Sequence, residues 1–189
     1  MNLNVDYFYD DYENIIIKKD KIEYKFIIKN QEATVITNNY DDIEEIVQFV
    51  KKLRPHVYKF HSPNNTYYQE FDIVYSFKLP IKIIQPSKFF IDKKIVDEIG
   101  DNINENNVYL PVQIINDEYV LLDGHTRLYC LNENYIKMVN VYLFKAEPHI
   151  PDFVYIAKEG NIKNISSIHV LDHEQYELYW NQLLEQFNL

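Results

Sequence analysis

Along the first third of the chain, β-branched and aromatic residues alternate with polar ones, which is the pattern of half-buried strands. We expect strands at Tyr12–Lys18, Lys21–Lys29 and Glu32–Thr37, with a hairpin turn at Lys19-Asp20 between the first two.

The spacing of apolar residues then changes to that of a helix. This helix is expected to begin at Asn39 or Asp41 and to end at Arg54-Pro55, because proline disfavours the helical conformation of the residue before it. Strands at Val57–Phe60 and Phe71–Phe77 are expected to follow it. The apolar positions of the helix are Ile43, Ile46, Val47, Val50 and Leu53.

Lys78-Leu79-Pro80 is expected to separate residues 1–78, an α+β unit of unknown role, from a central domain of residues 79–147. In the central domain, Asp92 is expected to cap a helix that carries Ile95, Val96 and Ile99 on its apolar face and reaches towards Ile103. A second helix is expected from Thr126 to Asn132, so that the order is β-α-β-β-α-β. The strands are expected at Ile81–Ile84, Val112–Ile115, Tyr119–Leu122 and Met138–Phe144, with a turn at Asn116-Asp117 between the middle two.

Residues 148–189 read as a helical extension that packs on the central domain. A short helix is expected at Val154–Lys158, before Gly160, and a longer one after Asp172, which forms a capping-box pattern with Gln175. The longer helix carries an apolar stripe, which we expect to pack on the core; a partner-binding helix is the alternative. The stripe consists of Tyr176, Tyr179, Trp180, Leu183, Leu184 and Phe187.

Composition narrows the class of protein. The chain has 189 residues, of which 47% are hydrophobic, and this is enough for a folded core. No apolar run approaches the roughly 18 residues that span a bilayer, and the N-terminus lacks an export signal. Cys130 is the only cysteine, so no disulfide is expected within the chain. These features together predict a cytoplasmic protein of the α+β class.

The net charge is −10. Nonspecific binding to nucleic acid needs clustered cations that release counterions from phosphates, so a DNA-coating role is not expected. A localised anion site depends on a few donors and not on the net charge, so it remains open.

Glycine and arginine are scarce in this chain. It contains three glycines, whereas globular chains average about 7%. Arg54 and Arg127 are the only arginines. One glycine and one arginine fall together in the pentapeptide Asp123-Gly124-His125-Thr126-Arg127, which follows an apolar strand and opens a helix.

The first turn of a helix attracts anions, because its N–H groups are unpaired and it holds the positive end of the helix dipole. Gly124 lets a phosphate approach the backbone, and Thr126 offers a hydroxyl donor. His125 offers a donor or a proton carrier, and Arg127 offers a charged fork for phosphate. Asp123 is a candidate cap, metal ligand or general base.

The alternative is an ordinary Asp-Gly turn, in which Asp123 only caps the helix and His125 and Arg127 are solvated. Lys82 and Lys88, near the first central strand, are lesser candidates for contact with a phosphate. His169 and His173 have a spacing that can bind zinc, but they lie on either side of the expected cap at Asp172. No metal site is therefore expected from protein ligands.

Residues 81–144 resemble the ParB/sulfiredoxin superfamily. The resemblance is carried by Ile83-Ile84-Gln85-Pro86-Ser87, Leu110-Pro111-Val112, the loop Asp123–Arg127 and Val139-Asn140-Val141-Tyr142. The loop is similar to the DGHxR loop of ParB-like proteins and is closest in motif to the free-serine-kinase-like members. The resemblance implies a ParB-like fold that binds ATP, ADP or CTP with magnesium. It implies phosphate contacts from Gly124, His125, Thr126 and Arg127, and its kinase-like members imply a catalytic or metal-coordinating role for Asp123. His125, as a proton carrier, is a second catalytic candidate.

Three departures from the family limit this expectation. His125 occupies the place of the sulfiredoxin cysteine, so reduction of a sulfinic acid is not expected. Two arginines cannot form the arginine-rich pocket of the partitioning proteins. The serine kinases place a glutamate just after the first strand, whereas this chain has no carboxylate there before Asp92. The loop and the resemblance together predict a protein that binds a nucleotide or another phosphate, and a small-molecule phosphotransferase is the leading candidate activity. The alternatives are a non-catalytic module that binds an anion or a protein, and a ParB-like nuclease or DNA-associated protein.

Overall fold

The computed structural model describes residues 5–9, 14–100 and 103–187. The chain divides into two compact units, Met1–Tyr75 and Ser76–Leu189. Each unit combines helices with sheet, which confirms the predicted α+β class. No helix in the described ranges is long and apolar enough to cross a membrane.

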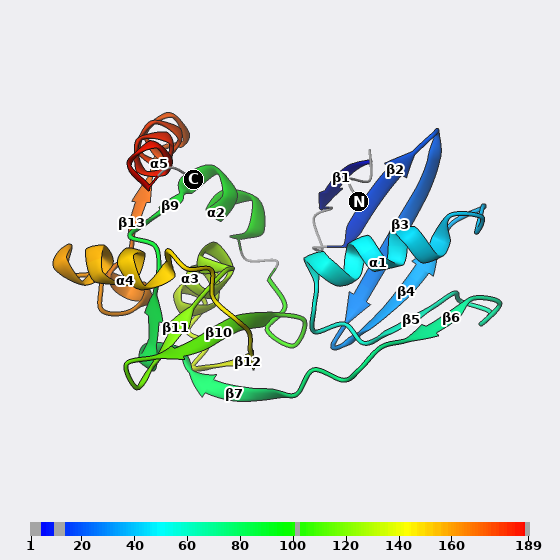
Figure 1. The fold of residues 1–189 in the computed structure, drawn as a ribbon, viewed down its shortest axis with the longest axis horizontal. Helices are drawn as coiled ribbons and strands as arrows, with labels where there is room; N and C mark the ends of the chain where they lie inside the picture. Colours follow the sequence, from blue (N-terminus) through cyan, green and yellow to red (C-terminus); the bar gives the residue numbers. More distant parts are fainter. Residues whose placement is uncertain (1–4, 10–13, 101–102, 188–189) are drawn as a thin grey trace. The chain divides into compact units, whose positions relative to one another are not determined.

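The first unit is a six-stranded sheet with helix α1 (Ile43–Leu53) packed on one face (Figure 1). Neighbouring strands are antiparallel except β4 and β5, which are parallel because α1 connects them. In sheet order the strands are β1 (Asp6–Tyr9), β2 (Ile15–Lys19), β3 (Ile22–Lys29), β4 (Glu32–Ile36), β5 (Lys59–His61) and β6 (Tyr68–Glu70).

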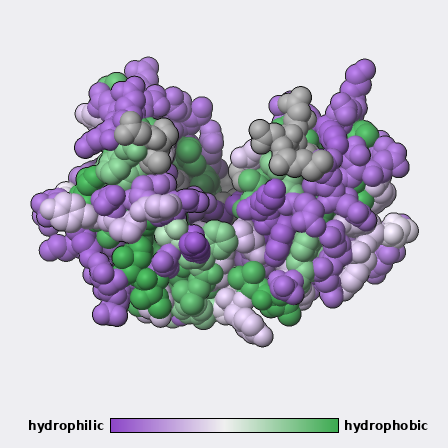
Figure 2. Space-filling view, viewed as in Figure 1, coloured by the Kyte–Doolittle hydropathy of each residue, from purple (hydrophilic) through white to green (hydrophobic). Residues whose placement is uncertain are grey.

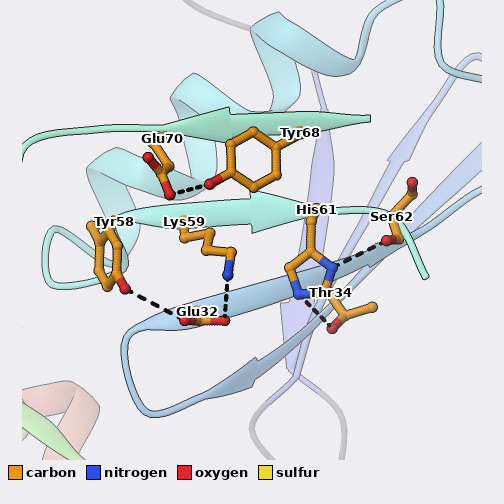
Figure 3. A network of polar contacts seen from close by, with 8 residues as sticks. All are labelled: Glu32, Thr34, Tyr58, Lys59, His61, Ser62, Tyr68 and Glu70. Atoms are coloured by element: carbon orange, nitrogen blue, oxygen red, sulfur yellow. Dashed lines mark hydrogen bonds and ion pairs between the residues drawn. The ribbon is translucent and has the colours of Figure 1, made fainter. Parts of the chain in front are cut away.

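One face of this sheet is apolar and the other is polar, because apolar and polar residues alternate along its strands. Tyr24, Phe26 and Ile28 of β3 point into the core with the apolar stripe of α1. On the opposite face, polar side chains pair across β4, β5 and β6 (Figure 3). There Glu32 pairs with Lys59, the Thr34 hydroxyl meets a ring nitrogen of His61, and the Tyr68 hydroxyl donates to Glu70.

Two predictions for this unit need correction. The hairpin turn lies at Asp20-Lys21, one residue later than predicted, where both residues have positive φ. The predicted strand Phe71–Phe77 is wrong. Residues 71–75 form no strand, and Ser76–Pro80 is a strand (β7) of the second unit, where it pairs with β12 (Met138–Leu143). The unit boundary therefore precedes Lys78-Leu79-Pro80, because a partner strand over 50 residues later in the chain decides where β7 belongs.

The second unit is built on a five-stranded sheet in the order β7-β12-β10-β11-β8. Its other strands are β8 (Ile84–Pro86), β10 (Tyr109–Ile115) and β11 (Glu118–Leu121). Helices α2 (Lys93–Ile99) and α3 (His125–Glu133) pack on one face through Val96, Leu128 and Leu131. Helix α4 (Ile150–Glu159) packs on the other through Ile150 and Val154 (Figure 1). Apolar side chains also reach the surface over this sheet (Figure 2).

Several predictions for this unit are confirmed, and one is wrong. Asn116 and Asp117 have φ of 50° and 64° and form the predicted two-residue turn between β10 and β11. Asp92 caps α2, since its Oδ1 accepts a hydrogen bond from the Lys94 N–H at 2.9 Å. The expected strand Ile81–Ile84 is instead a 3₁₀ turn at Ile81–Ile83 followed by β8.

The C-terminal segment contacts the rest of the second unit at strand β9 (Phe90–Asp92). Strand β13 (His169–Leu171) pairs with β9 in parallel, and helix α5 (His173–Phe187) follows (Figure 1). The rings of Tyr176 and Trp180 lie edge-on to the ring of Phe90, at 5.6 and 6.4 Å between centroids. Asp92 is only 2% exposed, and its Oδ2 lies 2.6 Å from His173 Nδ1. Asp92 therefore joins the starts of α2 and α5.

We predict that Asp92→Ala lowers the free energy of unfolding of the second unit by about 2 to 3 kcal/mol, because it removes a helix cap and a buried charged acceptor together. Urea unfolding followed by the fluorescence of Trp180, the single tryptophan, measures this value in the second unit. Asp97→Ala is the control, since Asp97 pairs with Lys93 on the exposed face of α2 and should cost at most about 0.5 kcal/mol. Equal losses in the two variants would contradict the role of Asp92.

Candidate functional site

The candidate site lies where β11 ends and α3 begins. Gly124 separates them in the left-handed conformation, with φ 80° and ψ 28°. A Cβ at Gly124 would lie 2.5 Å from Leu110 Cδ2, and 3.1 and 3.2 Å from Arg127 Nη2 and Nε. Both the backbone conformation and the available space therefore require glycine at this position.

Arg127 folds back over the glycine at the start of α3. Its side chain is only 12% exposed, and Nη2 lies 3.5 Å from Asp123 Oδ2. The Asp123 side chain is 73% exposed and open to water. The guanidinium is thus held by packing against the loop, since an exposed contact of this length contributes little by itself.

His125 is the first residue of α3, and its side chain is 3% exposed. The Ser87 backbone N–H, just after β8, donates to His125 Nε2 at 3.1 Å, and the Ser87 hydroxyl lies 3.2 Å from the same nitrogen. A backbone N–H can only donate, so Nε2 is the acceptor. The ring proton of the neutral imidazole is therefore on Nδ1.

Burial keeps His125 neutral. Together with the nearby charge of Lys88, burial lowers the pKa of the imidazole from 6.5 to about 3, against a smaller opposing effect of Asp123. His125 Nδ1 is buried and has no hydrogen-bond partner among the described residues. The site therefore holds a buried donor whose proton is available to an acceptor oxygen.

The carboxylate of Asp123 is stabilised as an anion. Desolvation raises its pKa, but the charge of Arg127, the backbone N–H of Gly124, and the nearby His125 and Lys88 together outweigh that effect and lower it. The pKa of Lys88 is itself lowered by burial, with Asp123 acting in the opposite direction. These shifts indicate that Lys88, Asp123 and Arg127 share one electrostatic environment.

The structure brings together all five residues that the sequence singled out, in one loop and the first turn of α3. Thr126 is half-buried at the second position of that helix. Ser87 was missed in this role, because its partner is brought close only by the pairing of two strands. β8 and β11 are parallel neighbours, with Pro86 opposite Leu121, so the residues after each strand reach the same edge of the sheet.

Of the other candidates, Lys88 is coupled to this cluster by its charge, whereas Asp92 and the two C-terminal histidines are not. Asp92, the first carboxylate after β8, serves the cap of α2 and His173. His169 is exposed. Within residues 5–9, 14–100 and 103–187, no three His, Cys, Asp or Glu side chains are grouped so that they could hold a metal. Cys130 is buried in α3, as expected for a core position.

Comparison with known proteins adds little. No family model matches the chain, and no curated protein matches it. Among solved structures, protein Atu1540 from Agrobacterium tumefaciens matches with a TM-score of 0.39 and 16% sequence identity. The match covers 51% of this chain and 62% of that one, so the chain spans less than two thirds of the length of the matched protein.

The first unit contains a groove that is lined by acidic residues, unlike the start of α3, where Arg127 and Lys88 lie. It is lined by Tyr40, Thr66 and Tyr67 together with the carboxylates of Asp41, Asp42, Glu44 and Glu45. Lys19 pairs with Asp42 and Glu45, which leaves the other two carboxylates to face the groove. Such a surface repels phosphate, so the α3 start is the better anion site.

We predict that Gly124→Ala lowers the free energy of unfolding by about 2 to 4 kcal/mol, because the new Cβ strains a left-handed backbone and overlaps Leu110. Urea unfolding followed by Trp180 fluorescence measures the change. In the control Gly160→Ala, the backbone is at φ −76° and the new Cβ would meet no atom closer than 3.4 Å. Its stability should change by no more than about 1 kcal/mol. A loss at Gly124 no greater than that of the control would show that the loop relaxes to accept a side chain.

The depressed pKa of His125 predicts a pH-dependent stability. The unfolded chain protonates this histidine near pH 6.5, whereas the folded protein does so only near pH 3. The contribution of the neutral His125 to the free energy of unfolding is therefore complete above pH 6.5. It falls as the pH drops towards 3, by at most about 1.4 kcal/mol per pH unit.

Urea unfolding at pH 7, 6 and 5 should accordingly give a shallower acid loss in His125→Gln than in the natural protein. The exposed His169→Gln should follow the natural profile. Parallel profiles for the natural protein and His125→Gln would mean that His125 is not held neutral.

Proposed function

We propose that the second unit binds a phosphate-bearing small molecule, a nucleotide with magnesium, at the start of α3. The observation that carries this proposal is the buried Nδ1–H of His125, which has no acceptor among the described residues. An unmade hydrogen bond of this kind costs about 1 to 3 kcal/mol, and a phosphate oxygen would supply the acceptor.

The surrounding groups suit the same ligand. The first turn of α3 presents backbone N–H donors and the positive end of its dipole. Arg127 adds a guanidinium that packing already holds in place, so a bound phosphate loses less side-chain entropy. Thr126 adds a hydroxyl. In the ParB/sulfiredoxin superfamily, which this loop resembles, the equivalent positions contact nucleotide phosphates.

Magnesium would be held mainly by the phosphates themselves. Mg²⁺ keeps several waters and needs only one or two protein carboxylates beside phosphate oxygens. Asp123 is an exposed carboxylate with a lowered pKa at the edge of the loop, so it fits this need. ATP, ADP and CTP are the nucleotides that the resemblance suggests.

We further propose that, if a nucleoside triphosphate transfers its terminal phosphoryl group to a hydroxyl oxygen here, the nucleoside diphosphate leaves and Asp123 accepts the proton of the hydroxyl. Asp92 is engaged by α2 and His173, and so is not free for this role. His125 is buried and its Nε2 already accepts a hydrogen bond from the Ser87 N–H, so it is better suited to donate a fixed hydrogen bond from Nδ1 than to accept a proton. A non-catalytic anion-binding module would have the same geometry, but it would not need the Asp123 carboxylate as a proton acceptor.

We predict that pyrophosphate or at least one of ATP, ADP, CTP and GTP, with MgCl2, binds the protein in isothermal titration calorimetry. Arg127→Gln should weaken binding by roughly 10-fold to 100-fold, because it removes a charge-assisted contact. Arg54→Gln makes the same charge change in the first unit, and its affinity should stay that of the natural protein.

Asp123→Asn separates binding from catalysis. It removes a negative charge beside the phosphate, so the affinity for pyrophosphate without MgCl2 should be kept or improved, while any transfer to serine or a related hydroxyl acceptor should be lost. The absence of binding by every probe, or equal affinities for Arg127→Gln and the natural protein, would refute the phosphate site. Binding without turnover in the natural protein would favour the non-catalytic module.

A further inference from the structure

Lys88 follows Ser87, whose backbone N–H holds His125, so the chain itself places Lys88 beside the start of α3. Its ammonium lies 4.2 Å from the centroid of the Trp180 ring on α5. This distance is within the range of an attractive cation–π contact. A residue of the C-terminal helix is thereby linked to the candidate phosphate site.

The surroundings of Lys88 are mostly apolar. Ser87 and Lys88 line a narrow crevice with Trp180 and Leu183 of α5 and with three phenylalanines, Phe89, Phe90 and Phe153. No described residue accepts a hydrogen bond from Lys88 Nζ or forms an ion pair with it. A buried ammonium normally has such an acceptor, because the ring face replaces only part of its hydration.

The charge of Lys88 acts on the candidate site. It contributes to the low pKa values of both His125 and Asp123, and the Asp123 charge acts on Lys88 in return. An anion at the start of α3 would therefore lie in the field of two cations, Lys88 and Arg127, on a chain whose net charge is −10.

We propose that Lys88 is a further phosphate-binding residue of this site and that Trp180 on α5 is its positioning residue. The phosphate supplies the hydrogen-bond acceptor that Lys88 lacks, and the indole face holds the ammonium where the phosphate binds. The C-terminal helix thereby becomes part of the site. This inference rests on the proposed phosphate binding, and it adds a ligand contact and a role for α5.

The first test is the affinity for pyrophosphate, and for ATP with MgCl2, measured by calorimetry on the full chain. Lys88→Met keeps the apolar stem and should weaken binding about 10-fold or more. Its melting temperature should not fall, because the substitution removes an ammonium that has no acceptor. Lys82→Met is the matched control, since Lys82 is exposed and should leave the affinity unchanged.

The second test uses the single tryptophan. Pyrophosphate should change the emission of Trp180 with the same saturation that calorimetry gives, and this change should be absent in Lys88→Met. Trp180→Leu should bind several-fold more weakly and Trp180→Phe should recover most of the loss. In the Lys88→Met background, neither Trp180 substitution should lower the affinity further. If the role of Trp180 were purely structural, its substitution would weaken binding equally with and without Lys88.

The outcomes separate this inference from the proposed function. If the natural protein binds pyrophosphate or ATP while Lys88→Met binds equally well, this inference is overturned and the phosphate site stands. The same holds if binding leaves Trp180 emission unchanged, or if Trp180→Leu costs as much without Lys88 as with it. If the natural protein binds none of pyrophosphate, ATP, ADP, CTP and GTP, the phosphate site and this inference are both overturned.

Discussion

The hydrogen bond from the Ser87 backbone N–H to His125 Nε2 is the contact on which the candidate site depends. It joins the end of β8 to the first residue of α3, which lie 38 residues apart in sequence. Because the N–H can only donate, it assigns the histidine proton to Nδ1, and burial then keeps the ring neutral. The backbone contact thus sets the orientation and tautomer of His125, and burial sets its charge. It also places Lys88, the next residue, beside the same helix start.

The C-terminal segment is tied to the same region through β9, which follows Ser87 and Lys88 in the chain. Strand β13 pairs with β9, Asp92 contacts His173, and Phe90 receives the aromatic face of α5. Trp180 reaches Lys88 from that face. The segment between β8 and α2 therefore contacts His125 at the start of α3 through Ser87 and contacts α5 through Lys88 and Phe90.

Much of the fold was predictable from local patterns. The apolar stripe marked α1, the Asn116-Asp117 turn defined the β10–β11 hairpin, and scarce glycine and arginine pointed to the Asp123–Arg127 loop. The errors arose where pairing with residues far away in the sequence determines whether a segment forms a strand. Ser76–Pro80 pairs with β12, so the expected strand Phe71–Phe77 failed, and Ile81–Ile83 turns before β8 begins. Ser87 carried no local sign of its role, because its partner is brought close only by the parallel pairing of β8 and β11.

We propose that His125 is a neutral, fixed donor that faces an anion when one binds at the start of α3. Two-bond ¹H–¹⁵N correlation NMR of the histidine rings at pH 7 tests it most directly, because it reports which nitrogen carries the proton. The account predicts that His125 is the Nδ1–H tautomer and that its Nδ1–H resonance shifts when pyrophosphate is added, while exposed His169 is unaffected. An Nε2–H tautomer, a protonated ring, or an Nδ1–H resonance that does not respond to pyrophosphate would contradict it.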